Sequence, residues 1–315
     1  MAVAANEMLC RICNKPMRAW TGRWLGFSWG RCRNCGSVQK LIDESTFDSL
    51  SPSYDPGFVS TDSTVRSELE ASMDVEGKGR LLKRLLDPND SGSLLDIGCG
   101  MGGFLLAGKR LGYEVFGVEP SASHGKAAVE VFGLNVVKGY FNSRDFSNQF
   151  DVVILSHVIE HIYRPVEFFA DVMRVVSPGG KLIVISPNCK SLAAIVCGRF
   201  WSMYKPIDHV TLFTKAAIKA AVPPGCVVQH LHTSEWPGEF AAHIASAMKT
   251  ASQPQLSNIG SSSAVVSVRQ STISAALWTI LTVLSFPFYV AAGAMDRQSC
   301  LYAVITKDSI VHQGA

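Results

Sequence analysis

Short apolar runs alternate with longer amphipathic stretches from Leu94 to the end of the chain. Seven runs have the length and composition of β-strands, and most gaps between them are long enough to hold a helix. This alternation is typical of a doubly wound α/β domain, in which helices cover both faces of a mainly parallel sheet. The expected strands are residues 93–97, 114–119, 135–138, 151–155, 181–186, 226–231 and 300–306.

The pattern before this sheet is less regular. Breaks at Pro52, Pro56 and Gly57 indicate a connector, and residues 79–86 become helical before Pro88. Residues 247–272 are rich in Ser, Gln, Asn and Ala, which favours a flexible insertion loop. We therefore expect a small module at 1–45, a connector with a helix at 46–90, a core at 91–235, an insertion with an apolar helical segment at 236–298, and a last strand with a tail at 299–315.

The apolar run near the end is long enough to span a bilayer, since residues 275–295 contain no charged residue. Two observations argue against a membrane span. A single crossing would place the last β-strand on the opposite side of the membrane from the rest of its sheet, and Pro287 interrupts the apolar run. We instead expect a bent pair of helices that covers the acceptor site or dips into one leaflet. Peripheral membrane contact through 275–295 is the resulting hypothesis.

Four cysteines near the start form two C-x2-C pairs separated by 18 residues: Cys10, Cys13, Cys32 and Cys35. This spacing is typical of a closed, structural zinc site with four thiolate ligands. Gly36 follows the last cysteine, where a tight turn needs it. Four unrelated buried cysteines or a redox pair are weaker interpretations.

A glycine-rich turn follows the first expected strand of the sheet, in the sequence LLDIGCGMGGF at 94–104. Gly98, Gly100 and Gly102 allow a sharp turn and a close approach to a ligand, and a helix then begins. Gly98, Gly100 and Gly103 also fit the dinucleotide fingerprint. The glycines alone therefore leave NAD and S-adenosylmethionine both open.

Two acidic residues narrow this choice. Asp96 suits the cationic amino group of a methionine moiety better than a pyrophosphate, which it would repel. Glu119 ends the next strand, where nucleotide-binding sheets place an acid against ribose hydroxyls. Asp96 therefore favours S-adenosylmethionine, and Glu119 supports a nucleotide without discriminating.

These segments, with GVEPS at 117–121, FDVVILSHVIEHI at 150–162 and SPGGKLIVISPN at 177–188, resemble the class I S-adenosylmethionine-dependent methyltransferases, especially the small-molecule group that includes ubiquinone-biosynthesis O-methyltransferases. The resemblance covers roughly 81–231. It implies a seven-stranded Rossmann-like sheet whose last strand is antiparallel. It also implies that Asp96 and the glycine turn line the methionine part, that Glu119 binds the ribose, and that residues after the third strand flank the adenine.

In this chain the third strand is followed by KGYFN, with Tyr140 where many relatives have an acid. Phe141 or Asn142 could replace that adenine contact. The expected cofactor-binding residues are Asp96, Gly98, Cys99, Gly100, Gly102, Glu119, Pro120, Tyr140, Phe141 and Ser156.

A general base is expected where the fourth strand ends, at the carboxyl edge of the sheet. His157 lies there, and Glu160 and His161 follow within one helical turn. His209, in KPIDHVTLFT at 205–214, is the rival base. One of these histidines could instead cap and orient its loop.

Composition adds limits to this picture. The 315 residues are 47% hydrophobic and 17% charged, with a net charge of +3, which is typical of a globular protein and too small to indicate a nucleic-acid partner. The first nine residues lack the features of a secretory signal, so we expect a cytoplasmic protein with reduced cysteines.

The sequence thus predicts an enzyme that methylates oxygen or carbon of a small-molecule acceptor with S-adenosylmethionine, and that carries a structural Zn2+. An NAD-dependent oxidoreductase and a non-catalytic module that docks a partner through its zinc ribbon are the alternatives. Oligomeric state is left open.

Overall fold

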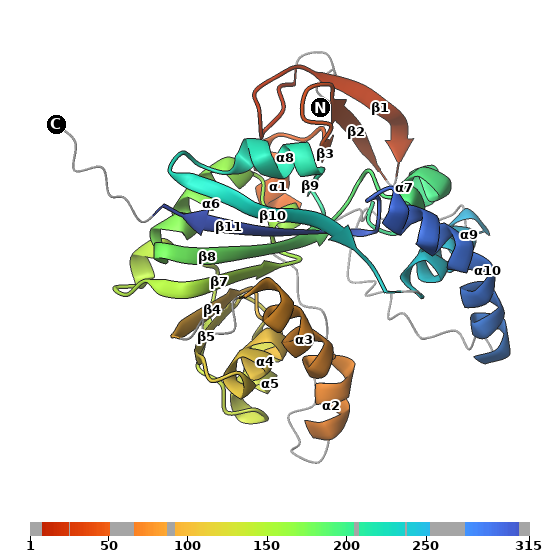
Figure 1. The fold of residues 1–315 in the computed structure, drawn as a ribbon. Helices are drawn as coiled ribbons and strands as arrows, with labels where there is room; N and C mark the ends of the chain where they lie inside the picture. The colour runs from red at the N-terminus through yellow and green to blue at the C-terminus, as the bar shows by residue number, and fades with distance from the viewer. Residues whose placement is uncertain are drawn as a thin grey trace.

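A computed structural model describes residues 8–24, 26–50, 66–86, 92–204, 208–236, 238–252 and 275–308. Its centre is a seven-stranded sheet with the strand order β10-β11-β8-β7-β4-β5-β6 (Figure 1). The strands are β4 (Ser93–Ile97), β5 (Glu114–Glu119), β6 (Val136–Lys138), β7 (Phe150–Ser156), β8 (Val176–Pro187), β10 (Cys226–Ser234) and β11 (Cys300–Lys307).

The pairing of these strands confirms the predicted mixed sheet. β4 pairs in parallel with β5 and with β7, and the neighbouring pairs β5–β6 and β7–β8 are also parallel. β11 is antiparallel to both β8 and β10. All seven expected strands are present. The largest difference is β8, which begins at Val176 instead of residue 181.

Both faces of the sheet are buried, which explains the continuous apolar runs of its strands. Leu94 and Val152 pack on one face with the helices α3 (Val75–Leu85), α4 (Gly103–Arg110) and α5 (Ala122–Glu130). Leu95 and Val153, the next residues in the same strands, pack on the other face with α6 (Pro165–Arg174) and α8 (Lys215–Ala221). Figure 1 shows these two helical layers on opposite sides of the sheet.

The amino-terminal module has a four-stranded sheet of its own, β1-β2-β3-β9. Three strands come from the module itself: β1 (Met17–Trp24), β2 (Phe27–Cys32) and β3 (Val38–Lys40). The fourth, β9 (Thr211–Leu212), pairs with β3 but comes from a segment far along the chain. The module is therefore joined to the rest of the protein through a shared sheet.

Shorter elements complete the described chain. α1 (Glu44–Leu50) and α2 (Arg66–Ser72) precede α3, which begins four residues before the helix that we predicted at 79–86. α7 (Leu192–Cys197) and three 3-10 turns, η3 (Ser143–Asp145), η4 (Ile159–His161) and η5 (Gly198–Phe200), lie in the connections.

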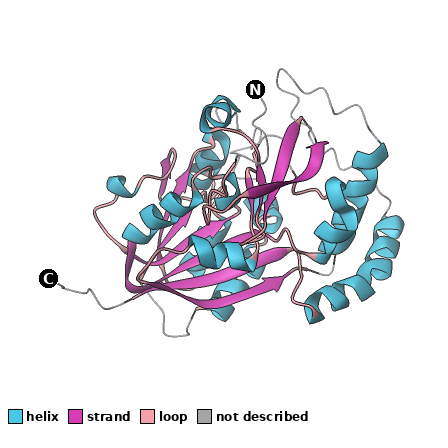
Figure 2. Ribbon diagram, turned by 90° about the horizontal axis from the view of Figure 1, so that it is seen from above, coloured by secondary structure: helices cyan, strands magenta, loops and turns pink. Residues whose placement is uncertain are grey.

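Two helices, α9 (Glu239–Ser252) and α10 (Ala275–Ala294), pack beside each other beyond one end of the strands (Figures 1 and 2). The prediction of a loop at 247–272 was wrong for 247–252, which continue α9 because Phe240 and Ala247 are buried in a core. The rest of that segment lies outside the described residues. The prediction of a bent pair of helices was wrong: the structure has one helix, α10, which continues through Pro287. The ring of Phe288 in α10 stacks on that of Phe240 in α9, with the ring centroids 5.4 Å apart.

In the part of the chain that the structure describes, no helix combines the length and the apolar character needed to span a membrane. α10 nevertheless carries large apolar side chains that are about half exposed or more. These are Ile280, Val283, Leu284, Phe286, Phe288 and Val290.

Candidate active site

The glycine turn after β4 lies where the strand order reverses, between β4 and its neighbours β5 and β7. Ligands of open α/β sheets bind at this position. Gly98, Gly100 and Gly102 have φ of 72°, 55° and 91°, the left-handed region that residues with side chains rarely adopt. A Cβ on Gly98 would lie 2.6 Å from a methyl of Val158. Gly102 caps α4 without a side-chain hydrogen bond, so the first amides of α4 can face a polar ligand.

Asp96 lies beneath this turn and is almost fully buried, with 2% of its surface exposed. Burial raises the pKa of Asp96 to about 8, the nearby Glu119 charge adds to the shift, and Lys78 opposes it. Its Oδ1 atom has no hydrogen-bond partner among the described residues. A buried carboxylate oxygen without a partner is costly, so this atom is suited to receive the ammonium group of a ligand.

Glu119 holds the glycine turn from the neighbouring strand. Its two carboxylate oxygens accept hydrogen bonds from the backbone amides of Gly100 and Ser121, each at 2.7 Å. Each oxygen retains a second lone pair, which a ribose hydroxyl could use. Glu119 can therefore position the turn and contact a nucleotide at the same time.

The other expected cofactor residues surround the same edge of the sheet. Cys99 is buried in the turn, Pro120 follows Glu119, and Ser156 ends β7. Tyr140 is 73% exposed beyond β6, whereas Phe141 packs in an aromatic cluster. Asn142 instead caps η3 by accepting a hydrogen bond from the amide of Arg144 at 3.1 Å.

His157 directly follows β7 at the carboxyl edge, with its side chain about half exposed. Its φ of 56° is left-handed, a strained conformation for a residue other than glycine. Its Nδ1 lies 3.2 Å from Oε1 of the fully buried Glu160. Ser186 donates a hydrogen bond to the other oxygen of Glu160 at 3.1 Å. The carboxylate is thus fixed behind the imidazole, an arrangement that suits a base and its orienting acid.

The charge of Glu160 is stabilised by its surroundings. Burial by itself would raise the pKa of this carboxyl group, but the hydrogen bond with His157 and the charges of His157, His209 and His161 lower it to about 2. Glu160 is therefore ionised at neutral pH, so its charge can stabilise the positive charge that His157 gains when it accepts a proton.

His161 and His209 lie on the inner side of the same carboxylate. Their rings meet edge-to-face at 4.8 Å. The Nδ1 atom of His161 lies 3.0 Å from the backbone oxygen of Asp208. The Nδ1 atom of His209 lies 2.8 Å from the backbone oxygen of Met203. His209 is only 2% exposed, so it is less accessible to an acceptor than His157. Glu160, His161 and His209 bring one ligand atom each within 4.8 Å of one another, a spacing that a divalent cation could bridge.

The four cysteines of the amino-terminal module converge, although they come from two distant knuckles. The sulfur atoms of Cys10 and Cys35 are 3.6 Å apart, those of Cys13 and Cys32 are 3.4 Å apart, and all four lie within 4.8 Å of one another. Tetrahedral zinc with Zn–S bonds of ~2.3 Å places sulfur atoms ~3.8 Å apart. The cluster is therefore of the size that Zn2+ requires.

Both knuckles turn in the same way. Asn14 and Gly36, each directly after the second cysteine of its pair, have φ of 53° and 74°. The hydrogen bond with Cys35 lowers the pKa of the Cys10 thiol to about 4, and backbone amides contribute, whereas burial opposes the shift. A thiolate is the form that binds a metal.

Arg11, between the first two cysteines, connects the cysteine cluster to the carboxyl edge. Its guanidinium group donates to the backbone oxygens of Lys40 at 3.1 Å and Val210 at 2.7 Å, and it lies 4.5 Å from the ring centroid of Tyr163. The amide of Val210 in turn donates to the backbone oxygen of Glu160 at 2.9 Å. The module thus contacts the segments that carry His209 and Glu160.

Sequence reasoning missed a second polar cluster at this edge, formed by Glu235 after β10 and by Glu239 and His243 on α9. Glu235 is 8% exposed and His243 is 4% exposed. The charge of His157 is close enough to affect the ionisation of Glu239, and the charge of Glu160 is close enough to affect that of Cys300 at the start of β11. The two polar clusters therefore lie near the same edge of the sheet. The i,i+4 spacing of Glu239 and His243 was a usable signal, but nothing in the sequence linked it to His157.

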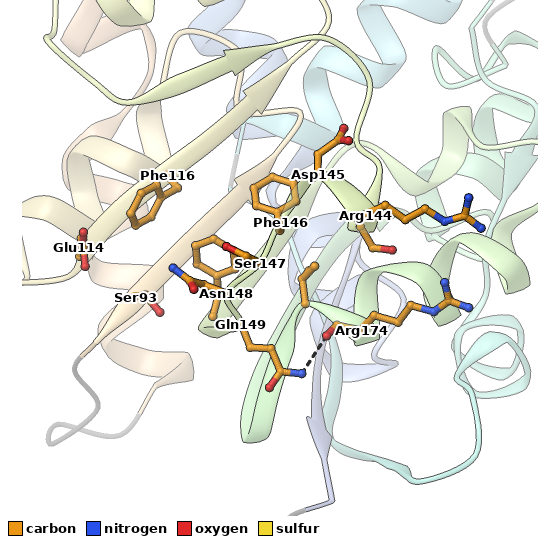
Figure 3. A pocket seen from close by; sticks show the side chains of 13 residues that line it. Ser93, Glu114, Phe116, Arg144, Asp145, Phe146, Ser147, Asn148, Gln149 and Arg174 are labelled. Carbon is orange, nitrogen blue, oxygen red and sulfur yellow. Dashed lines mark hydrogen bonds between the residues drawn. The ribbon is translucent and has the colours of Figure 1, made fainter.

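A cavity of about 960 Å3 lies at the opposite edge of the sheet (Figure 3). Its walls include Ser93 and Glu114, at the amino ends of β4 and β5, and Gln149, which donates to the backbone oxygen of Arg174 at 2.9 Å. Because the glycine turn and His157 follow the carboxyl ends of their strands, we do not assign this cavity to the donor site.

Comparison with known proteins agrees with this geometry. Residues 68–222 match the family model described as a methyltransferase domain. A ubiquinone biosynthesis O-methyltransferase of Bradyrhizobium sp. (strain ORS 278) is 34% identical over 116 residues, which are 33% of this chain and 44% of that protein. One of Caulobacter sp. (strain K31) is 30% identical over 149 residues, 45% of this chain and 56% of that protein. The chain spans about half the length of these curated relatives.

A crystal structure of a SAM dependent methyltransferase from Archaeoglobus fulgidus has a TM-score of 0.44 and 19% identity, covering 75% of this chain and 95% of that one. Residues 68–222 thus match the methyltransferase-domain family, and the order of strands β4 to β8 and the glycine turn after β4 are features that this match covers.

Proposed function

We propose that the protein transfers a methyl group from S-adenosylmethionine to a small-molecule acceptor, on a hydroxyl oxygen or an acidic carbon, and releases S-adenosylhomocysteine. The observation that carries this proposal is the buried, unpartnered oxygen of Asp96 beneath the glycine turn. An ammonium group donates hydrogen bonds to that oxygen, whereas a pyrophosphate has no donor to offer it. The names of the O-methyltransferase relatives favour oxygen as the accepting atom.

Different residues at the carboxyl edge bind the donor and activate the acceptor. S-adenosylmethionine, when bound, supplies a methyl group on a positively charged sulfur. Asp96 binds the amino group of the donor, and Glu119 binds the ribose and fixes the turn through Gly100. His157 accepts the proton of the acceptor hydroxyl as the oxygen–carbon bond forms and the carbon–sulfur bond breaks. Glu160 stabilises the imidazolium that results.

Titration calorimetry with S-adenosylmethionine, S-adenosylhomocysteine and NAD tests the proposal. We expect the first two to bind and NAD not to bind. Asp96→Ala should abolish the binding of both S-adenosyl ligands, with Asp145→Ala, on exposed η3, as the matched control. Binding of NAD alone would replace this proposal with an oxidoreductase.

We also propose that Cys10, Cys13, Cys32 and Cys35 hold a structural Zn2+. The sulfur spacing supports it, as does the position of Arg11 and Thr214 between the cluster and the core, where Thr214 donates to the backbone oxygen of Cys35 at 2.6 Å. Metal analysis of protein purified without added zinc should find about one zinc per chain. Less than a tenth of a metal per chain would contradict the assignment.

A third proposal concerns membranes. The exposed apolar side chains of α10 support peripheral contact with a lipid surface through residues 275–295. Co-sedimentation with liposomes should retain the protein, and Leu284→Glu with Phe286→Glu should release it. Equal retention of the wild type and this double variant would remove the proposal.

A further inference from the structure

The second polar cluster at the carboxyl edge contains more hydrogen-bond acceptors than the protein satisfies. Glu235 uses one oxygen to accept from the backbone amide and the hydroxyl of Ser299, at 2.9 and 2.5 Å. Its other oxygen, Oε1, is buried and has no partner among the described residues. An isolated buried carboxylate oxygen is costly unless a ligand donates to it.

His243 offers a second unsatisfied atom in this cluster. Its Nδ1 lies 2.7 Å from the hydroxyl of Ser202, which fixes the ring. Its Nε2 is buried without a hydrogen bond and lies 3.9 Å from Oε1 of Glu239, too far for a direct one. Burial lowers the pKa of His243 to about 4, so the ring is neutral at physiological pH. When Nδ1 donates to Ser202, Nε2 presents a lone pair toward Glu239.

Glu239 completes the cluster and connects it to the catalytic edge. Burial raises its pKa to about 7, the charge of Glu235 adds to the shift, and the charge of His157 opposes it. The thiol of Cys300 is 3.6 Å from its Oε1. Among the described residues no lysine or arginine forms an ion pair with Glu235 or Glu239. The cluster therefore places two carboxyl groups together without a fixed cation to neutralise them.

We propose that Glu235, Glu239 and His243 form the acceptor subsite and bind a protonated amino group of the acceptor, so that the substrate is an amine-bearing small molecule. This inference rests on the proposed methyltransferase function and names its substrate class. An alkylammonium group has three N–H donors and no acceptor, which matches two carboxyl groups that ionise beside it and the lone pair that Nε2 of His243 presents when Nδ1 donates to Ser202. A neutral hydroxyl has one donor and would leave the remaining acceptors unsatisfied.

The position of the subsite fits this role. Glu239 lies within the electrostatic reach of His157, and β11, which carries Cys300, is hydrogen-bonded to β8 next to Ser186, the partner of Glu160. An acceptor whose amine is held by α9 can thus extend its reactive hydroxyl toward His157. The amine would hold one end of the acceptor, and His157 with Glu160 would contact the hydroxyl at its other end.

The test uses the full-length protein saturated with S-adenosylhomocysteine and a matched pair of probes, dopamine and 4-ethylcatechol. The two share a ring and both hydroxyls, and only dopamine carries an amine. By calorimetry we expect dopamine to bind at least about tenfold more tightly, because only dopamine can donate charged hydrogen bonds to the carboxyl groups of the subsite. Glu239→Gln and Glu235→Gln should remove this preference and leave the weak binding of 4-ethylcatechol unchanged.

Glu167→Gln, an exposed substitution on α6, is the matched control and should keep the preference. Affinity for S-adenosylhomocysteine and the thermal midpoint, measured for each variant, establish that it is folded. Equal binding of the two probes, or no binding of either at millimolar concentration while S-adenosylhomocysteine still binds, would overturn the amine subsite. Loss of S-adenosylhomocysteine binding by the wild type would instead overturn the proposed function.

Discussion

Asp96→Asn separates donor binding from folding, because the carboxyl group of Asp96 is protonated in the ligand-free protein at neutral pH. With a pKa of about 8, roughly nine-tenths of these groups hold a proton at pH 7. Binding a cationic amino group requires the carboxylate, so the proton must leave. The donor has a titration of its own, since an α-amino group has a pKa of about 7.9 and must remain protonated.

The two titrations predict a bell-shaped dependence of S-adenosylmethionine affinity on pH. The fraction of pairs in the required carboxylate–ammonium state is about 0.01 at pH 6, about 0.08 at pH 7, about 0.22 at pH 8 and about 0.07 at pH 9. Affinity should therefore rise about 20-fold from pH 6 to pH 8 and fall about threefold by pH 9. Asp96→Asn should lose the rising limb, and its affinity at pH 8 should fall by about 10- to 100-fold.

The same shift sets the sign of the effect on stability. The pKa of Asp96 is raised from 3.8, so the folded state holds more protons than the unfolded chain between about pH 4 and pH 8. The free energy of unfolding therefore decreases as pH rises through this window, by about 4 kcal/mol at pH 7. Asparagine removes this titration, so Asp96→Asn should raise the thermal midpoint of the ligand-free protein while it weakens donor binding.

Calorimetry from pH 6 to pH 9 and thermal denaturation of the ligand-free protein measure both effects. 5′-Methylthioadenosine, which lacks the amino acid part of the donor, is the ligand control and should bind without the rising limb. Asp145→Asn is the matched variant control. A flat affinity profile for the wild type between pH 6 and pH 8, or unchanged affinity in Asp96→Asn, would refute the assignment of Asp96 to the donor amino group.

Three further outcomes are expected. His157→Gln and Glu160→Gln should lower kcat by about 10²- to 10⁴-fold with unchanged affinity for S-adenosylhomocysteine, and full turnover in His157→Gln would exclude it as the base. Gly98→Ala should abolish donor binding because its Cβ would lie 2.6 Å from Val158 within the glycine turn. Gly112→Ala shares the positive φ, 93° against 72°, but it has open space around it and lies outside the turn, so it should keep donor binding. Arg11→Ala should lower the free energy of unfolding by about 2–4 kcal/mol, since it removes the two charged hydrogen bonds of the guanidinium group and its contact with Tyr163. Exposed Arg33→Ala in the second knuckle should be nearly neutral by chemical denaturation.

The central sheet could be predicted because its strands carry a strong local signal. Leu94 and Leu95, like Val152 and Val153, are apolar on successive positions because helices cover both faces. The convergence of the four cysteines could also be predicted from the sequence, because the spacing of the two C-x2-C pairs indicates which side chains come together. In both cases the information lies within a few residues of the feature that it determines.

The rest depends on contacts between distant segments. β9 is only two residues long, too short for a hydrophobic pattern, so its pairing with β3 could not be predicted from the sequence. α9 was partly interpreted as a loop because its small residues resemble a linker, although Phe240 and Ala247 bury it. Glu239 and His157 are 82 residues apart, and the order in which β10 and β11 join the sheet brings them to one edge.

The position of β9 has a consequence for the role of the cysteine module. Thr211 and Leu212 pair with β3, and the preceding His209 packs against His161, so one short segment belongs to the module's sheet and to the catalytic edge. Arg11 strengthens this connection because it bonds the backbone oxygen of Val210 from between two cysteines. The segment beside Glu160 therefore contacts the cysteine module directly, whereas the glycine turn follows β4 and is separated from the module by β7. Partial removal of metal from the proposed zinc site should accordingly lower the rate of methyl transfer to the acceptor more than the affinity for S-adenosylmethionine, a difference that a module without these contacts would not produce.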